Sequence, residues 1–287
     1  DKAVVAYSRV LRYRYFFADT QKRFAKSYRS SGGNGYLLVQ GGVGDILQSL
    51  PFMLENKDFK YLIQTHFLGA KNLLSDLGVE AHELHLCSSL GEYKKLEQDL
   101  IKRDGVFMCP RAIFFEQSPF LIDSETLRVK PNTVGVHVSA SAIAIQKALP
   151  DSFLIDLLGL LNRLNLEVLL FCTKSEANHF RSIGIVEKKK LKFISEEEIF
   201  MSLAQVERCA LFIGSDSVFK TMSSMLKIPT FVLFHNIKNR FRDRMFINPY
   251  VKEGVMNYLE YDHFSSHEVE RILSNLSSWI DRKLSSE

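Results

Sequence analysis

The sequence predicts an α/β protein of two Rossmann-like domains with a central cleft, preceded by a basic helical arm. Two separate runs of short apolar segments alternate with longer amphipathic segments, as in parallel sheets covered by helices. The pattern breaks around residues 117–133, where prolines flank a polar stretch. With 46% hydrophobic and 24% charged residues among 287, the composition is globular rather than disordered. The predicted parts are an arm at 1–35, a first domain at 36–130, a second domain at 131–262 and a C-terminal helix at 263–287.

The N-terminal arm carries most of the basic character of the chain. Residues 1–30 contain eight lysines and arginines against two aspartates, whereas the whole chain has a net charge of +4. Apolar side chains recur there at helical spacing: Val10, Tyr13, Phe17, Phe24 and Tyr28. Such a helix can pack on its own domain or on an upstream one, lie on an anionic membrane surface, or bind nucleic acid. Because nothing else in the chain resembles a nucleic-acid module, we expect no nucleic-acid partner and keep packing and membrane contact as alternatives.

The first run of strands and helices follows a glycine-rich joint at residues 30–35. A buried strand leads into a glycine turn, and a helix opens at Asp45. Strands are expected at 36–40, 61–65, 82–86 and 106–109, with helices over 69–77 and 89–103.

The second run repeats the alternation. Strands are expected at 133–138, 166–171, 191–194, 211–214 and 230–234, with helices over 151–164, 175–183, 196–208 and 216–226. A last helix over about 266–284 begins with Ser265 and Glu268, which have the spacing of a capping box. Because ligands of parallel α/β sheets bind at the carboxyl ends of strands, we look for functional residues there.

The turn after the first strand is one candidate. Gly41, Gly42 and Gly44 allow a ligand to approach the backbone closely, and the helix N-terminus behind them favours anions. Asp45, in the first helical turn, suits either a helix cap or a catalytic carboxylate. Neither the GxGxxG dinucleotide fingerprint nor the P-loop motif is present, which argues against a nicotinamide-dependent oxidoreductase.

Two further candidates follow strands of the second domain. Ser139, Ser141 and Lys147 lie in a loop between a strand and a helix, where they suit a phosphate oxyanion or form a polar surface loop. Asp216, followed by Ser217, lies where a strand gives way to a helix. This carboxylate either caps the helix or binds hydroxyls of a sugar or a ribose.

Several classes of protein are disfavoured. Four scattered cysteines without a CxxC pair, and eight histidines without metal-ligand spacing, predict no metal, no cofactor and no disulfide scaffold. The nucleophile motif GxSxG is absent. No run of eighteen apolar residues and no signal peptide is visible, so we expect a cytoplasmic protein, at the inner face of the membrane if the arm binds lipid. The chain begins at Asp1, so an upstream segment could be missing from view.

Three segments, taken in order, resemble glycosyltransferase family 9, the bacterial heptosyltransferases. Residues 44–51, GDILQSLP, match the family's turn of Gly-Asp, two aliphatic residues, x, Ser or Thr, x and Pro. Residues 134–138 and then KALP at 147–150 resemble the opening of the family's second domain. SDS at 215–217 and MSSMLKIPT at 222–230 resemble its third motif. Val218 and Thr221 stand where the family has glycine and histidine, and the first domain is shorter than is usual there.

The resemblance implies the GT-B fold and metal-independent transfer of a sugar, with inversion, from a nucleotide-diphosphate sugar to an acceptor hydroxyl. Asp45 would be the general base, and Lys147 would hold the donor diphosphate. The donor, of heptose type among others, and the acceptor would be bound by Gly42, Gly44, Ser139, Ser141, Glu176, Asp216 and Ser217. The acceptor could be a saccharide, a lipid-linked saccharide or a protein. The alternative is a non-catalytic GT-B-like module that binds a nucleotide or a partner.

Overall fold

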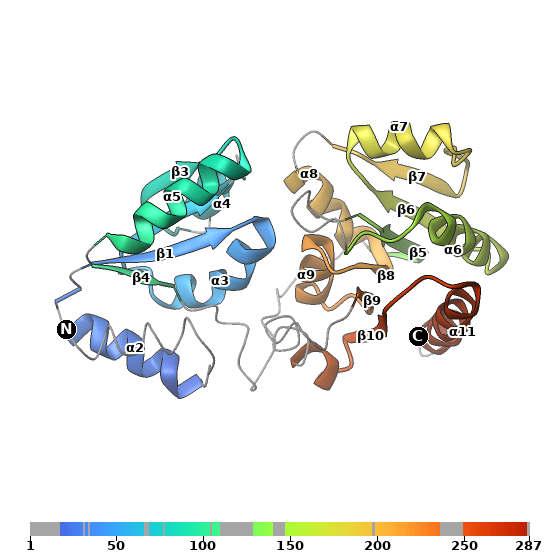
Figure 1. Cartoon of the computed structure of the whole chain (residues 1–287). Coiled ribbons are helices and arrows are strands. Elements are labelled where there is room, and N and C mark those ends of the chain that lie inside the picture. The colour runs from blue at the N-terminus through green and yellow to red at the C-terminus, as the bar shows by residue number, and fades with distance from the viewer. Residues whose placement is uncertain are drawn as a thin grey trace. The chain divides into compact units, whose positions relative to one another are not determined.

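The computed structural model describes residues 18–30, 32–33, 35–65, 69–76, 78–103, 105–109, 129–139, 147–196, 199–235 and 249–285. The chain divides into two compact units, Asp1–Phe120 and Leu121–Glu287. Each unit contains its own parallel sheet covered by helices (Figure 1). The division falls inside the 117–133 stretch in which the sequence pattern breaks, ahead of the predicted boundary between residues 130 and 131.

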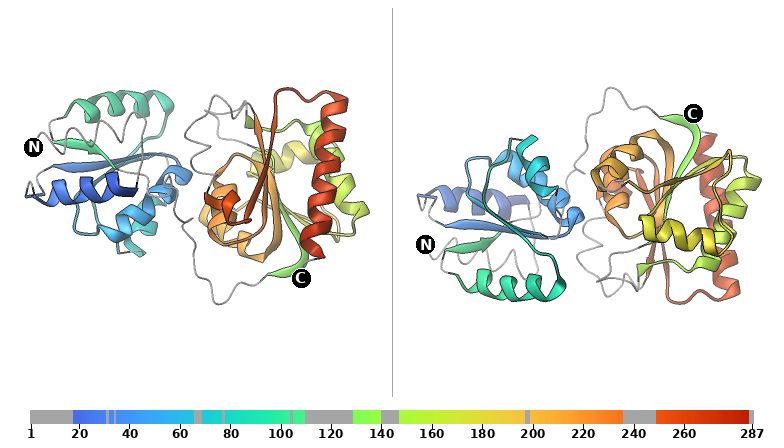
Figure 2. Two further views of the ribbon diagram at one scale, coloured as in Figure 1. Left: turned by 90° about the horizontal axis from the view of Figure 1, so that it is seen from below. Right: turned by 90° about the horizontal axis from the view of Figure 1, so that it is seen from above.

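The first unit has a four-stranded sheet in the order β3-β2-β1-β4, with every pair of neighbours parallel. The two central strands, β1 and β2, are largely apolar and buried, as expected of a sheet covered on both faces, whereas the edge strand β3 carries polar residues and is half-buried to exposed. Figure 2 shows α5 on one face of this sheet and α2 on the other. In chain order the elements are α2 (Ala18–Ser30), β1 (Tyr36–Gly41), α3 (Val43–Glu55), β2 (Tyr61–Thr65), α4 (Ala70–Asp76), β3 (Ala81–Leu86), α5 (Leu90–Lys102) and β4 (Val106–Met108).

Helix α2, the described part of the basic arm, packs on this unit. Phe24 and Tyr28 are buried, and the Tyr28 ring lies 4.5 Å from the ring of Phe59. The Tyr28 hydroxyl donates to the carbonyl of Gly35 at 2.6 Å, and the Arg29 guanidinium pairs with Asp58 at 2.9 Å. The apolar face predicted for the arm is therefore used, at these positions, for packing on the chain's own domain. The other predicted members of that face, Val10, Tyr13 and Phe17, lie outside the described residues.

The second unit has a six-stranded parallel sheet in the order β10-β9-β8-β5-β6-β7. Counted from the first strand of the unit, this is the 3-2-1-4-5-6 order of a doubly wound Rossmann sheet, and the first unit has the 3-2-1-4 part of it. Its elements are β5 (Lys130–His137), α6 (Asp151–Arg163), β6 (Glu167–Phe171), α7 (Lys174–Ser182), β7 (Leu191–Ile194), α8 (Ile199–Ala204), η3 (Gln205–Arg208), β8 (Cys209–Ser215), α9 (Val218–Met225), β9 (Thr230–His235), β10 (Met256–Tyr261) and α11 (Ser266–Leu284).

Helices cover both faces of this sheet. Figure 1 shows α8 and α9 on one face and α6 and α11 on the other. Trp279 and Ile280 of α11, Phe153 of α6 and Val134 and Val136 of β5 belong to one buried cluster, which forms the core of the unit. The predicted helix α11 begins as expected, because the hydroxyl of its N-cap Ser265 accepts the backbone N–H of Glu268.

Several elements differ from the sequence prediction. Helix α3 begins at Val43 rather than at Asp45, and β5 begins at Lys130 rather than at residue 133. Strand β10 was not predicted, because at the edge of the sheet its exposed face carries polar residues that interrupt the apolar run. The helix predicted over 196–208 is the short α8 followed by the 3₁₀ turn η3. Helix α9 begins at Val218 rather than at residue 216, because β8 continues to Ser215 and Ser217 is the N-cap.

Candidate functional site

The carboxyl ends of β5 and β8 form the topological switch point of the second unit. These strands are neighbours, and their following helices, α6 and α9, cover opposite faces of the sheet (Figure 1). Such a point leaves room for a ligand beyond the strand ends. The Ser215 hydroxyl donates to the carbonyl of Ser139 at 2.5 Å, which ties the two ends together. Gly214 is required beside them, because a Cβ there would overlap the carbonyl of His137.

Asp216 lies at this point between two ammonium groups. Its Oδ2 is 2.7 Å from Lys147 Nζ, and its Oδ1 is 2.7 Å from Lys220 Nζ. The Asp216 side chain is only 7% exposed. Burial alone would raise the pKa of Asp216, but Lys220 and Lys147 outweigh it and hold that pKa well below the usual range. The carboxylate is therefore ionised, and these three groups together carry one positive charge.

Sequence reasoning did not single out Lys220. It lies one turn after Asp216, which is the i,i+4 spacing of an ion pair on a helix, and that spacing was the available signal. The side chain is 3% exposed, and its Nζ lies 5.8 Å from the centroid of the Phe234 ring. The prediction that Asp216 either caps α9 or binds hydroxyls thus missed the ion pairs that this carboxylate makes.

Glu176 and Ser139 form a second polar group at the same end of the sheet. Glu176 stands in the first turn of α7, where its carboxylate accepts the Thr173 backbone N–H at 2.6 Å in a capping box. Burial raises the pKa of Glu176, but hydrogen bonds from Ser139 and Thr173 outweigh it and lower the pKa overall. Through Ser139, Glu176 is linked to Ser215, and so to the connection that carries Asp216.

Within the described part of the chain, two buried polar atoms at these strand ends have no hydrogen-bond partner. They are Nδ1 of His137 and the hydroxyl of Ser217. Burial lowers the pKa of His137 to about 4, so its imidazole is neutral near pH 7. The ring lies 4.5 Å from that of Phe219. Orphaned buried polar atoms are uncommon in folded proteins and here accompany the ion pairs of Asp216. Ser141, which was also predicted for this loop, lies outside the described residues.

The glycine turn of the first unit holds Asp45 in a capping arrangement. Asp45 Oδ2 accepts the backbone N–H of Gly42, the N-cap of α3, at 3.0 Å. Gly41 has φ +125°, and a Cβ there would overlap the Asp45 carboxylate, so this glycine makes room for the cap. Gly44 lies in the first turn of α3, half-buried. A capping function of Asp45 is thus present in the structure, and a catalytic function remains a prediction.

The described residues contain no group of three or more His, Cys, Asp and Glu side chains that could hold a metal ion. Among the helices of the described segments, none has both the length and the apolar character needed to cross a bilayer.

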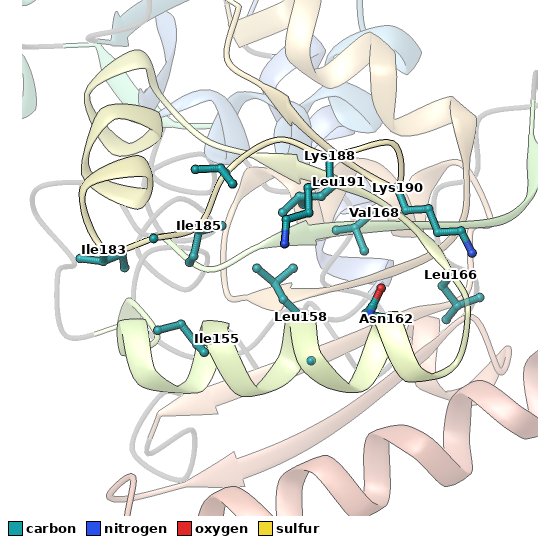
Figure 3. Close-up of a pocket in the computed structure, with 13 residues that line it drawn as sticks. Ile155, Leu158, Asn162, Leu166, Val168, Ile183, Ile185, Lys188, Lys190 and Leu191 are labelled. Atoms are coloured by element: carbon teal, nitrogen blue, oxygen red, sulfur yellow. The ribbon is translucent and has the colours of Figure 1, made fainter.

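An apolar groove of about 320 Å³ lies elsewhere on the second unit. Figure 3 shows it between α6 and the segment that leads into β7, with Lys188 and Lys190 among aliphatic side chains. Leu166, Val168 and Leu191 line it at the amino ends of β6 and β7. The groove is therefore at the opposite end of the sheet from Asp216 and does not belong to the candidate site.

The two Rossmann-like units define the chain as a protein with the GT-B fold. A solved structure of E. coli ADP-heptose LPS heptosyltransferase II is similar to it, with a TM-score of 0.58 and 14% identity over 88% of this chain and 99% of that one. At this identity the likeness shows the fold, and it confirms the GT-B fold that the resemblance to glycosyltransferase family 9 predicted.

Two further solved structures are more distant. E. coli heptosyltransferase WaaC with ADP has a TM-score of 0.43 and 13% identity, over 96% of this chain and 81% of that one. A glycosyl transferase family 9 protein from Veillonella parvula has a TM-score of 0.41 and 14% identity, over 89% and 70%. No family model matches the sequence, and no curated protein matches it significantly.

Proposed function

We propose that the protein is a glycosyltransferase that moves a sugar from a nucleotide-diphosphate sugar, of heptose type among others, to an acceptor hydroxyl. The observation that carries the proposal is the cationic group at the switch point of the second unit, where Lys147 and Lys220 flank the buried Asp216. The partly buried ammonium group of Lys147, beside a strand end, suits an anionic diphosphate. The GT-B fold supports the same function, since the similar E. coli protein is named as an ADP-heptose heptosyltransferase.

In this proposal the second unit binds the donor. Lys147, whose side chain is 23% exposed, holds the diphosphate and stabilises the charge that grows on it as it leaves. Glu176 contacts the nucleoside, Ser139 lies close to the phosphates, and Asp216 keeps Lys147 in place before the donor arrives. Ser141 and Ser217 complete the donor contacts.

The first unit supplies the acceptor side of the reaction. The acceptor hydroxyl attacks the anomeric carbon while the bond from that carbon to the diphosphate oxygen breaks on the opposite face, which inverts the centre. Asp45 takes the hydroxyl proton, a contribution of about 10²–10⁴-fold to the rate. Gly42 and Gly44 allow the acceptor to approach the backbone. No metal takes part, because Lys147 neutralises the leaving group.

The decisive experiment separates catalysis by Asp45 from its capping function. In Asp45→Asn the amide oxygen can still accept the Gly42 N–H, but the side chain can no longer take a proton. We expect normal thermal stability, normal binding of a nucleoside diphosphate and transfer reduced at least about 100-fold. A panel of nucleotide-sugars, with release of nucleoside diphosphate as the readout, identifies the donor first. Full activity in Asp45→Asn would leave Asp45 as a cap only.

The alternative is a GT-B-like module without catalysis that binds a nucleotide or a partner. The capping bond of Asp45 favours it, because that bond occupies a carboxylate oxygen that a general base would use. Thermal stabilisation by a nucleoside diphosphate, combined with no turnover of any nucleotide-sugar in the panel, would support the module and exclude the enzyme.

For the acceptor we propose a saccharide, a lipid-linked saccharide or a protein, reached at the inner face of the membrane in the lipid-linked case. The basic arm of residues 1–30 would then contact anionic lipid. Phe24 and Tyr28 are buried on the first unit, whereas Lys22 and Lys26 are exposed, so the described part of the arm would bind by charge. Salt-sensitive sedimentation with phosphatidylserine vesicles, lost in Lys22→Glu/Lys26→Glu, tests this contact.

A further inference from the structure

The two ammonium groups on Asp216 differ in how firmly the fold holds them. Lys147 and Lys220 approach different oxygens of the carboxylate, each at 2.7 Å. The Lys147 side chain is 23% exposed and the Lys220 side chain 3% exposed. Asp216 therefore has one counter-ion at the edge of the site and another in the interior of the unit.

The origins of the two lysines in the chain explain this difference. Lys220 lies in the first turn of α9, four residues after Asp216, and its ammonium also faces the buried ring of Phe234. Lys147 comes from the connection between β5 and α6 and reaches Asp216 across 69 positions of sequence. The Asp216–Lys220 pair is therefore local in sequence and enclosed, whereas the Asp216–Lys147 pair joins the connection after β5 to the connection after β8.

This arrangement bears on how Lys147 can bind a donor. Moving Lys147 to a diphosphate takes an ammonium from a carboxylate that is 7% exposed, and separating a buried pair in this way is costly. Lys220 reduces that cost in two ways. It remains on Asp216 at the same distance as Lys147, and its positive charge repels Lys147 and so weakens the pair that must break.

Resting on the proposed function, we propose that Lys220 is a positioning residue that allows Lys147 to exchange Asp216 for the diphosphate of the donor. Lys220 itself stays on Asp216 throughout. The site thus holds Lys147 in place when it is empty and releases it when a diphosphate arrives.

The first test follows Lys147 without any ligand. Acylation by an N-hydroxysuccinimide ester, read by mass spectrometry against exposed Lys188 in the same sample, measures how often Lys147 leaves Asp216. Lys220→Met should slow labelling of Lys147 about tenfold, because the remaining pair is tighter. Asp216→Asn, and the double variant Lys220→Met/Asp216→Asn, should label faster than the wild type. If Lys220 only packed the interior, Lys220→Met would loosen the site and label Lys147 faster, which would overturn the proposal.

The second test measures binding of inorganic pyrophosphate by calorimetry in the same four proteins. Lys220→Met should weaken binding about tenfold, and adding Asp216→Asn should restore it, because Lys147 no longer has a carboxylate to leave. Lys192→Met, which removes an exposed lysine of β7, controls for the loss of one charge and should bind as the wild type does. Thermal unfolding of every variant shows which of them are folded. Lys220→Met/Asp216→Asn removes both charges of the buried Asp216–Lys220 pair, so neither charge is left without its partner.

The outcomes separate this proposal from the proposed function. Equal pyrophosphate binding by the wild type and Lys220→Met would leave the donor site intact and overturn the function of Lys220. Binding to none of the four proteins, even with the predicted order of labelling, would overturn the diphosphate site and with it both proposals.

Discussion

The two units share a strand order but differ in the polar contacts at the ends of their strands. In the first unit Gln40 and Gln64, near the ends of β1 and β2, make neutral hydrogen bonds: the Gln40 amide donates to Gln64 at 2.7 Å, and Gln64 donates to the Tyr93 carbonyl at 2.7 Å. In the second unit the corresponding region contains the ion pairs of Asp216. A shared topology therefore places comparable strand ends in both units, whereas a few side chains there give the two ends different networks of polar contacts.

The carboxylates of Asp45 and Asp216, each near the start of a helix, also differ in the groups that they contact. Asp45 bonds to the backbone of its own helix start, three residues away. Asp216 precedes the N-cap of α9 and binds two lysines, one of them from a distant connection. The first carboxylate acts locally on a helix, and the second joins separate parts of a domain.

Removing each of these two carboxylates should give the largest difference in stability loss between the two units. Asp216→Ala leaves two ammonium groups close together in a buried site, and we expect it to lower the free energy of unfolding by about 3–5 kcal/mol. Asp45→Ala removes a half-exposed cap and should cost only about 1 kcal/mol. Urea denaturation of both variants measures the difference. Equal losses would mean that the ion pairs of Asp216 contribute no more than a cap.

His137 should make the stability of the second unit depend on pH. Burial lowers the pKa of this imidazole to about 4 from an ordinary value of 6.5, so the unfolded chain binds its proton more readily than the folded one. The stability due to the neutral imidazole is therefore complete above pH 6.5 and is lost as the pH falls toward 4. The loss should be about 3 kcal/mol at pH 4.

His137→Gln should remove this part of the pH dependence. The quantity to compare is the change in unfolding free energy between pH 7 and pH 4, which should be about 3 kcal/mol smaller in the variant. Parallel curves for the two proteins would show that the His137 site admits a proton without unfolding.

Much of this arrangement could be predicted from the sequence, because strands buried on both faces are apolar runs that turn residues delimit. The same logic placed Ser139, Lys147 and Asp216 after strands, and the resemblance to glycosyltransferase family 9 added Glu176. The structure brings these four residues to one end of the second sheet. Strand β10 escaped detection because an exposed edge strand has no apolar run. Four residues of η3 are too few to distinguish a 3₁₀ period from an α period.

The contacts of charged side chains could not be predicted in the same way. The spacing of Asp216 and Lys220 fits an ion pair on any helix, exposed or buried, and only packing against Phe234 and the sheet shows that Lys220 is enclosed. Likewise, the sequence allowed Asp45 either to cap its helix or to act as a catalytic carboxylate, and only the structure shows that the carboxylate lies against Gly41. Burial and side-chain direction depend on contacts between residues that are far apart in the chain.

Gly41→Ala tests the local character of the cap in the first unit. The substitution is strained twice, by φ +125° and by the overlap of its Cβ with the Asp45 carboxylate, and should cost about 2 kcal/mol. Gly159→Ala in α6 is the matched control, since its Cβ would lie 3.7 Å from Arg163 in ordinary contact. Helix propensity there should raise stability by up to about 1 kcal/mol. Two changes of equal sign would contradict this account of Gly41.

The smallest expected effect concerns α2, the described part of the basic arm, which packs on the first unit. Arg29 pairs with Asp58 and also donates to Asn56 at 2.9 Å, but the side chains of the ion pair are 47% and 58% exposed. Water and salt screen such a pair, so Arg29→Ala should lower the free energy of unfolding by about 1 kcal/mol or less, and the difference from the wild type should shrink in 1 M salt. A loss that salt leaves unchanged would show that the stacking of Arg29 on Phe59, at 4.7 Å, holds the helix in place of charge. In that case packing of the Arg29 side chain would hold α2 on the first unit, whereas ion pairs join the connections of the second unit at Asp216.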